Sequence, residues 1–166
     1  MTGTSGMPGK SHIIGLISDT HGLVRPDVHT ALAGVELILH AGDVGGADIL
    51  AELELIAPVR AVRGNTDSPD DPPLPAQIEL TVGGVRIHVS HGHEVGSPNP
   101  QRLLERYDAD VIVYGHTHKQ LVTRAANRWV VNPGAAGPRR FDLMPSVAKL
   151  TIVDGAVEIE TLDLAQ

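Results

Sequence analysis

Residues 111–118 have the sequence VIVYGHTH, an apolar run followed by two histidines one residue apart. The apolar part, residues 111–114, predicts a short buried strand. Two histidines in this spacing at a strand end can face one centre, and neutral imidazole is the commonest protein ligand of transition metals. A pair of solvent-exposed loop histidines is the alternative, because the motif alone is weak. The other strand ends decide between these interpretations.

Apolar runs and helical patterns alternate along the chain, separated by turn residues. Besides 111–114, strands are expected at 12–18, 35–40, 59–62, 78–82, 85–90, 121–125, 128–131, 147–153 and 157–162. Helices are expected at 26–33, 47–56 and 100–107. The strand–helix–strand steps predict parallel strands with right-handed crossovers, whereas the last four strands have an antiparallel pattern. The pattern is typical of the α/β (or α+β) class.

Good oxygen or nitrogen ligands follow five of the expected strands, and none of them is a thiol. In open α/β sheets, ligand sites form outside the carboxyl ends of the strands. The candidate ligands are Asp19, His21, Asp43, Asn65, His91, His116 and His118. The glycines beside them, which let the backbone turn sharply, are Gly22, Gly42, Gly64, Gly92 and Gly115.

Seven ligands are too many for one metal ion. We therefore expect two divalent cations that share Asp43 as a bridge. The donor set suits manganese, iron, zinc or nickel better than copper(I). Two cations roughly 3.5–4 Å apart form a known clamp for displacement at phosphorus.

Composition limits the possible functions. The 166 residues fit one domain, which we expect at 11–166 after a disordered leader at 1–10 that lacks the apolar part of a signal peptide. The net charge of -7 argues against a nucleic-acid surface, and no apolar run approaches the length of a membrane span. The chain has no cysteine, which excludes disulfides and thiolate sites and fits a cytoplasmic location.

Six motifs occur in a fixed order along residues 12–162. They are Asp19-Thr20-His21, Gly42-Asp43, Gly64-Asn65-Thr66-Asp67, His91-Gly92-His93, Gly115-His116-Thr117-His118 and Asn132-Pro133-Gly134. In this order they resemble the calcineurin-like metallophosphoesterases, and above all the small YfcE-type phosphodiesterase branch. The resemblance implies a four-layer fold, in which two mixed β-sheets pack face to face and helices flank them.

The resemblance also divides the ligands between two metal ions. One ion would be held by Asp19, His21, Asp43 and His118. The other would be held by Asp43, Asn65, His91 and His116. We expect Mn²⁺, with Ni²⁺, Fe²⁺, Zn²⁺ or Mg²⁺ as alternatives.

The chain departs from many relatives at two positions. Thr66 stands where they carry a histidine that stabilises the transition state or protonates the leaving group, although the small branch often lacks that histidine too. A threonine hydroxyl can donate a hydrogen bond but is a poor proton donor at neutral pH. Ala135 replaces the usual serine after Asn-Pro-Gly, where backbone amides could still contact phosphate.

Five further residues are candidates for supporting roles. Asp67 could orient a ligand or the attacking water, or cap the following loop. His93 could contact the substrate, or cap a turn. Arg139 and Arg140 could hold a phosphate oxygen, or be solvated. His40 precedes Asp43 on a strand, and we expect it to pack behind the ligands.

We therefore expect a metal-dependent phosphodiesterase acting on a small phosphoester. A hydroxide bridging the two metals would attack phosphorus in line, while the metals and Asn65 neutralise charge on the equatorial oxygens. One alternative is a non-catalytic protein-binding scaffold, as in the retromer-type trafficking complex, where the ligand set is degraded. The other is a phosphomonoesterase. The sequence leaves the natural substrate and the oligomeric state open.

Overall fold

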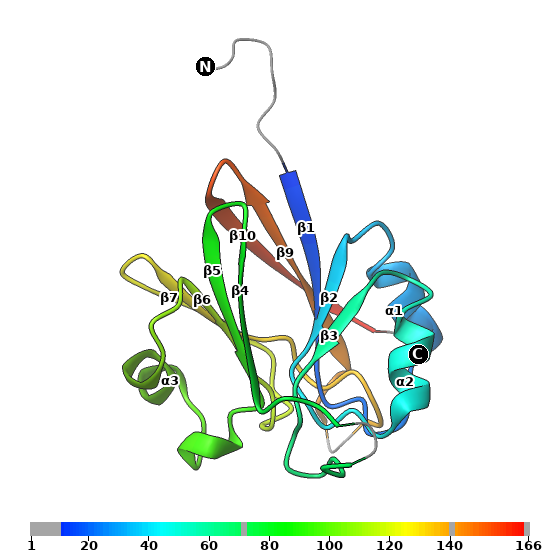
Figure 1. The fold of residues 1–166 in the computed structure, drawn as a ribbon. Helices are drawn as coiled ribbons and strands as arrows, with labels where there is room; N and C mark the ends of the chain where they lie inside the picture. The colour runs from blue at the N-terminus through cyan, green and yellow to red at the C-terminus, as the bar shows by residue number, and fades with distance from the viewer. Residues whose placement is uncertain (1–10, 71–72, 140–141, 165–166) are drawn as a thin grey trace.

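Two five-stranded sheets form the centre of the structure, a computed structural model that describes residues 11–70, 73–139 and 142–164 (Figure 1). The expected leader at 1–10 lies outside the described residues. The strands and the three α-helices occur where the sequence predicts them, with ends that differ by a few residues. The short 3₁₀ helix η1 (His93–Val95) was not predicted, because three residues carry no periodic pattern.

The first sheet has the strand order β10-β9-β1-β2-β3. Its parallel part consists of β1 (Ser11–Ile17), β2 (Leu37–His40) and β3 (Val59–Ala61). On the other side of β1, β9 (Ser146–Val153) and β10 (Ala156–Asp163) continue the sheet with antiparallel pairing. The last four residues of β1 are all buried, as its nearly continuous apolar sequence predicts.

The second sheet has the strand order β4-β5-β6-β8-β7. β4 (Gln77–Val82) and β5 (Val85–Ser90) form the expected hairpin, and β6 (Val111–Val113) pairs in parallel with β5. β8 (Arg128–Asn132) is antiparallel to the edge strand β7 (Leu121–Ala125), as predicted. It is also parallel to β6, which the local sequence pattern did not indicate.

Helices cover the outer faces of both sheets, so the fold has four layers (Figure 1). α1 (Pro26–Ala31) and α2 (Ala47–Leu53) pack on the first sheet, and α3 (Pro100–Arg106) packs on the second. Proline at the start of α1 and α3 fits the helix, because its fixed φ is helical and its missing amide would be unpaired there anyway. The prediction of two mixed sheets with flanking helices is confirmed.

The largest apolar cluster lies between the two sheets, where their inward-facing side chains meet. It includes Leu16, Leu39, Ile87, Val113 and Leu150, all of which are buried. Truncating such a leucine or isoleucine to alanine typically costs about 2–5 kcal/mol. This cluster therefore holds the sheets, and the loops that leave them, in a fixed relation.

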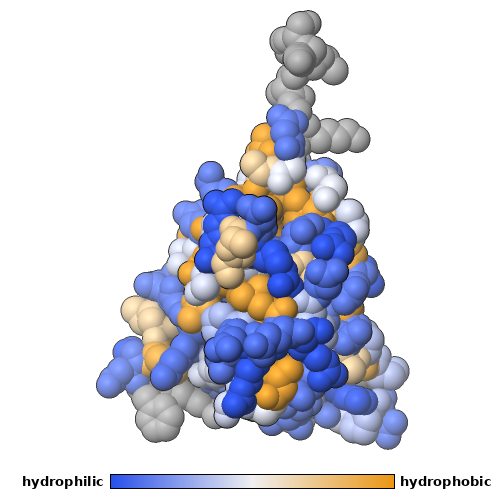
Figure 2. All heavy atoms as spheres, turned by 90° about the vertical axis from the view of Figure 1, so that its left-hand side faces the viewer, coloured by the Kyte–Doolittle hydropathy of each residue, from blue (hydrophilic) through white to orange (hydrophobic). Residues whose placement is uncertain are grey.

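The face of the molecule that carries α3 and β7 is shown in Figure 2. On the face that carries α3 and β7, hydrophilic residues predominate and hydrophobic ones form separate patches (Figure 2). Among the described residues, no helix has the length and apolarity needed to cross a membrane.

Pairing between β1 and β2 continues past the regular strands. The amide of Asp19 donates to the carbonyl of Gly42 at 3.0 Å, and the amide of His21 donates to that of Asp43 at 2.9 Å. These bonds hold the loop after β1 against the loop after β2. Both loops lie at the end of the sandwich that is opposite the start of β1 (Figure 1). The backbone thus places candidate ligands from both loops side by side.

Candidate metal centre

The first ligand cluster surrounds the carboxylate of Asp19. Its Oδ1 lies 3.4 Å from Nε2 of His118 and 3.6 Å from Nε2 of His21. One ligand atom of each residue lies within 4.8 Å of the others, a spacing that one cation can span. All three residues belong to the set that the sequence assigned to the first metal.

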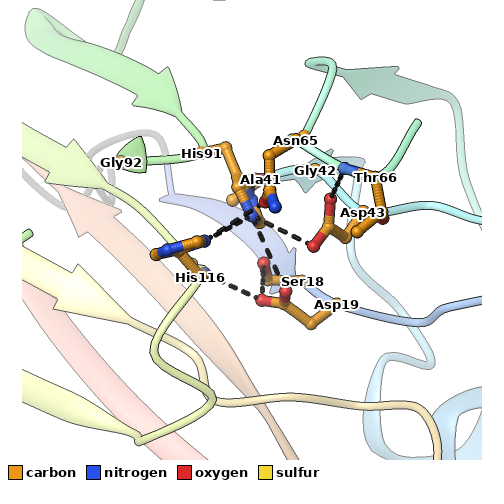
Figure 3. A network of polar contacts seen from close by, with 12 residues as sticks. Ser18, Asp19, Ala41, Gly42, Asp43, Asn65, Thr66, His91, Gly92 and His116 are labelled. Atoms are coloured by element: carbon orange, nitrogen blue, oxygen red, sulfur yellow. Dashed lines mark hydrogen bonds and ion pairs between the residues drawn. The ribbon is translucent and has the colours of Figure 1, made fainter. Parts of the chain in front are cut away.

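The second cluster, drawn in Figure 3, consists of Asp43, Asn65, His91 and His116. Nε2 of His91 is 3.2 Å from Oδ2 of Asp43 and 3.3 Å from Nδ1 of His116. The same Nδ1 of His116 is 3.2 Å from Oδ1 of Asn65. The structure thus brings together the four residues that the sequence assigned to the second metal.

Both carboxylates lie between the two clusters. Oδ2 of Asp43 is 3.6 Å from Nε2 of His21 as well as 3.2 Å from that of His91. Oδ1 of Asp19 also approaches His91, at 3.9 Å. Asp43 therefore has the position expected of a bridge, and Asp19 is closer to the second cluster than the sequence assignment suggested.

The two sheets contribute to the centre together. Loops after β1, β2 and β3 of the first sheet supply Asp19, His21, Asp43 and Asn65. Loops after β5 and β6 of the second sheet supply His91, His116 and His118. The ligand set therefore spans the joint between the two sheets at one end of the sandwich.

Hydrogen bonds hold one oxygen of each carboxylate and leave the other turned to the histidines (Figure 3). Oδ2 of Asp19 accepts from the hydroxyl of Ser18 at 2.6 Å and from the amide of His116 at 3.1 Å. Oδ1 of Asp43 accepts from the amide of Thr66 at 2.9 Å. Such supporting bonds orient a ligand before a metal binds.

The ring of His91 is oriented in the same way. Its Nδ1 lies 2.8 Å from the carbonyl oxygen of Ala41, which can only accept, so Nδ1 carries a proton. In the neutral ring, Nε2 is then an acceptor that faces the carboxylate of Asp43 at 3.2 Å. Two acceptors at this distance need a proton or a cation between them.

Two buried polar atoms at the centre make no hydrogen bond within the described part of the chain. They are Oδ1 of Asp19 and Nε2 of His21. Leaving such groups unpaired costs free energy, which native proteins avoid. A divalent cation bound by both atoms would satisfy them, so the residues fit the metal that the sequence predicts.

The electrostatics favour ionised carboxylates. Burial works to raise the pKa of Asp19, but the adjacent His118 and His21 outweigh it and hold this pKa well below its usual range. Burial likewise opposes ionisation of Asp43, yet its contact with His91 lowers the pKa of that carboxyl to about 2. The centre therefore offers two negative charges to a cation at neutral pH.

The backbone at the centre is strained. Among the described non-glycine residues, positive φ angles occur at Asp19, His21, Asp43, His116, His118, Ala126 and Asp154. The last two lie in hairpin turns, and the other five are predicted metal ligands. This conformation is uncommon for side chains larger than glycine and is a known mark of functional sites.

Two glycines make room for the carboxylates. A Cβ on Gly64 would come within 2.1 Å of Oδ1 of Asp43, and one on Gly115 within 2.0 Å of Oγ of Ser18 and 2.6 Å of Oδ2 of Asp19. Neither glycine has a positive φ, so their role is close approach. The remaining glycines of the predicted set do have positive φ: Gly22, Gly42 and Gly92.

Asp67 binds the backbone of two loops. Its carboxylate accepts from the amides of Gly64 at 2.8 Å, Val44 at 3.2 Å and Gly45 at 3.2 Å. These contacts cap loops that precede Asp67 in the chain, whereas the sequence prediction was a cap for the following loop. A direct part in the reaction stays a prediction.

His40 connects two loops behind the ligands, as expected. The amide of Gly42 donates to its Nδ1 at 3.1 Å, so Nε2 carries the proton and lies 2.9 Å from the hydroxyl oxygen of Thr20. That hydroxyl donates to the carbonyl of Val44 at 2.7 Å. Burial lowers the pKa of His40 to about 4 and keeps the ring neutral.

The other candidates lie at the rim. The exposed ring of His93 has its centroid 5.4 Å from that of His91 and 6.3 Å from that of His116. Arg139 is exposed and lines a small cavity beside His118. Arg140 lies outside the described residues. The roles of all three in substrate binding stay predictions.

Some of the supporting groups were missed by the sequence analysis. Ser18 was not singled out, although a serine directly before the strand-end Asp19 is a local signal for such a hydrogen bond. The carbonyl of Ala41, which orients His91, leaves no signal because any residue offers one.

Comparisons with known proteins agree with this geometry. The calcineurin-like phosphoesterase superfamily domain matches residues 13–155. The chain is 36% identical over 161 residues to a protein of Methanothermobacter thermautotrophicus named "probable metallophosphoesterase", covering 90% of this chain and 91% of the relative. It is 27% identical over 143 residues to a phosphodiesterase of Methanocaldococcus jannaschii, covering 73% of this chain and 82% of the relative.

Among solved structures, Vacuolar Protein Sorting 29 from Cryptosporidium parvum has the same fold. The TM-score is 0.78 at 24% identity, over 94% of this chain and 99% of that chain. Fold and donor set together define a two-sheet protein with a candidate metal centre at its strand ends. The chain belongs to the calcineurin-like phosphoesterase superfamily, which confirms the resemblance found in the sequence.

Proposed function

We propose that this protein is a metal-dependent phosphodiesterase that acts on a small phosphoester. The observation that carries the proposal is the pair of carboxylates, Asp19 and Asp43, each with one oxygen held by hydrogen bonds and the other turned toward histidines. The name of the Methanocaldococcus jannaschii relative, a phosphodiesterase, supports a diester substrate.

Two divalent cations are the proposed cofactors, with Mn²⁺ as the first candidate and Ni²⁺, Fe²⁺, Zn²⁺ or Mg²⁺ as alternatives. Bound at the centre, they would lower the pKa of a water molecule and offset the negative charge of the phosphate. The proposed ligands of one are Asp19, His21, Asp43 and His118. The proposed ligands of the other are Asp43, Asn65, His91 and His116.

The protein's own contribution is orientation before the substrate arrives. The carbonyl of Ala41 fixes the tautomer of His91, and the amide of Thr66 turns Oδ2 of Asp43 toward the ligand rings. Asn65 points its carbonyl oxygen to His116, so its NH₂ group is free to donate to a non-bridging phosphate oxygen. Donors placed in advance need little reorganisation as charge develops in the transition state.

A protein-binding scaffold without activity is the rival function. The shared fold with Vacuolar Protein Sorting 29 favours it, although likeness at 24% identity concerns the fold alone. The clustering of Asp19, His21, Asp43, His91 and His118 favours the enzyme, because a scaffold has no need of buried polar atoms that lack hydrogen-bond partners there.

Metal analysis combined with an ester assay tests the proposal. We expect two equivalents of Mn²⁺ per chain and faster hydrolysis of bis(4-nitrophenyl) phosphate than of 4-nitrophenyl phosphate, compared across Mn²⁺, Ni²⁺, Mg²⁺ and Zn²⁺. Asp43→Asn should remove most activity. The control is His29→Gln, since that ring pairs with Glu52 at 2.9 Å on the helical side of the first sheet. Preference for the monoester would indicate a phosphomonoesterase, and no metal uptake with no hydrolysis would favour the scaffold.

A further inference from the structure

A cavity of about 180 Å³ lies beside the metal centre. It is lined by the loop after β3, the start of β4, helix η1 and helix α3. Segments from both sheets therefore meet there, as they do at the centre itself. The residues that carry chemistry on its walls are Arg63, His93, Glu94, Arg106 and Tyr107.

Two of these residues connect the cavity to the candidate ligands. His93 lines the cavity, and its ring centroid is only 5.4 Å from that of His91. Arg63 is two residues before Asn65, in the loop whose Gly64 contacts Asp43. His93 and the loop at 63–65 are thus common to the cavity wall and to the surroundings of the candidate metal centre.

The guanidinium groups of Arg63 and Arg106 are available to a ligand. Within the described part of the chain, neither takes part in a hydrogen bond or ion pair through its side chain. Arg106 is positioned over the ring of Tyr107, with its Cζ 5.7 Å from the ring centroid. Stacking of this kind holds an arginine in place without using its hydrogen-bond donors.

Among the described residues that line the cavity, the carboxylate of Glu94 is already in use. Glu94 accepts from the amide of Gly92 at 3.0 Å and from the hydroxyl of Tyr107 at 2.7 Å. Its oxygens are therefore engaged, and it does not pair with either arginine. The described lining residues thus bring two arginine charges against one carboxylate charge, in a chain whose net charge is -7.

We propose that this cavity binds a second phosphate group of the substrate, carried on the ester arm that extends past His93. This inference rests on the proposed function, since it names the substrate class of the same site: phosphodiesters with a further phosphate on one arm. Phosphate suits a pair of arginines because each guanidinium can present two parallel N–H donors to its oxygens. Positive charge confined to this wall would also orient the substrate.

A matched pair of esters tests the subsite. The first is 4-nitrophenyl propyl phosphate, and the second carries an added phosphate at the end of its propyl group. We expect the wild type to favour the second by about tenfold in kcat/KM, mainly through KM. Arg63→Gln and Arg106→Gln should each remove most of this preference while leaving hydrolysis of the first ester unchanged.

The control is Arg124→Gln, which removes the same charge from β7, where Arg124 stacks over Trp129 at 5.1 Å. It should retain the preference. A preference that is equal in the wild type and both cavity variants would overturn the subsite, as would the absence of any preference in the wild type.

A binding measurement separates failure of the subsite from failure of the proposed function. Calorimetry on the metal-loaded protein compares propyl phosphate with propane-1,3-diyl bisphosphate. Tighter binding of the bisphosphate that depends on Arg63 and Arg106 supports the subsite, even if no ester is hydrolysed. Equal binding of the two ligands refutes it, even if the diesterase activity is present.

Discussion

His91 and Asp43 face each other across the joint between the two sheets, with 3.2 Å between Nε2 and Oδ2. His91 follows β5 of the second sheet, and Asp43 follows β2 of the first. Burial alone would lower the pKa of His91, but Asp43 outweighs it and raises this pKa in the metal-free chain. A cation held by both residues would replace that proton and join the sheets.

Metal removal should therefore lower thermal stability. At a free metal concentration 100 times the Kd, binding adds about 2.7 kcal/mol, which corresponds to a Tm rise of roughly 5–10 °C for a chain of this size. Differential scanning fluorimetry with Mn²⁺ and then with a chelator measures the shift. The Asp43→Asn variant should lose most of the Mn²⁺-dependent rise in Tm, and the His29→Gln variant should keep it. An identical Tm for wild type with and without Mn²⁺ would count against a metal at this joint.

Asp67→Ala should act mainly on stability. It removes the acceptor of three backbone amides and should lower the free energy of unfolding by about 1–3 kcal/mol, as measured by urea denaturation. Asp67→Asn keeps an acceptor oxygen and should recover part of the loss. The control is Asp70→Ala, an exposed carboxylate in the same loop. A stable Asp67→Ala protein with abolished turnover would instead assign Asp67 a role in the reaction.

Hydrolysis should depend steeply on the leaving group. Thr66 is exposed beside Asp43 and is a poor proton donor, and general acid help is typically worth 10²–10⁴-fold. Aryl phosphodiesters should thus react far faster than alkyl ones. Thr66→His should flatten the dependence of rate on leaving-group pKa, measured over a series of esters. A different result would assign the role of general acid to His93: the rate of the wild type would depend only weakly on leaving-group pKa, and the dependence would become steeper in His93→Ala.

Acidification should destabilise the protein through His40. Its pKa is about 4 in the folded protein and about 6.5 when unfolded, so above pH 6.5 both states are neutral at this ring. Below pH 6.5 the His40 ring binds a proton in the unfolded state. In the folded state the ring stays neutral down to about pH 4. The free energy of unfolding should fall across this window by up to about 1.4 kcal/mol per pH unit.

Urea denaturation of the metal-free protein between pH 7.5 and 4.5 measures this dependence. His40→Gln removes the titrating group and should give a shallower pH slope than the wild type, whatever its stability at pH 7.5. Equal slopes for wild type and His40→Gln would show that the buried ring is not the source.

The sequence predicted which candidate ligands lie close together, because these residues are tied to a local signal. Asp19 and His116 directly follow apolar strands, and strand ends of parallel segments gather at one edge. It could not predict the parallel pairing of β8 with β6, because that pairing joins strands that are separated by β7 in the chain. The cavity next to the centre was missed for the same reason, since Arg63 and Arg106 are 43 residues apart.

Asp67 illustrates a different limit. Its position in the motif left two roles open, orienting a ligand or the attacking water and capping the following loop, because the sequence of the motif is the same in both cases. Only the contacts with amides of another loop favour capping. A side chain that binds backbone groups far away along the chain produces no periodic pattern in the sequence.

The left-handed backbone at the five ligand positions makes loss of the site an easy evolutionary step. A strained non-glycine residue costs about 1–3 kcal/mol, and glycine adopts the same φ freely. Changing His116 or His118 to glycine would thus remove a candidate ligand and relax the backbone in one step. If the proposed catalysis were no longer selected, such changes would raise the stability of the fold, and the two-sheet structure would persist without the metal centre.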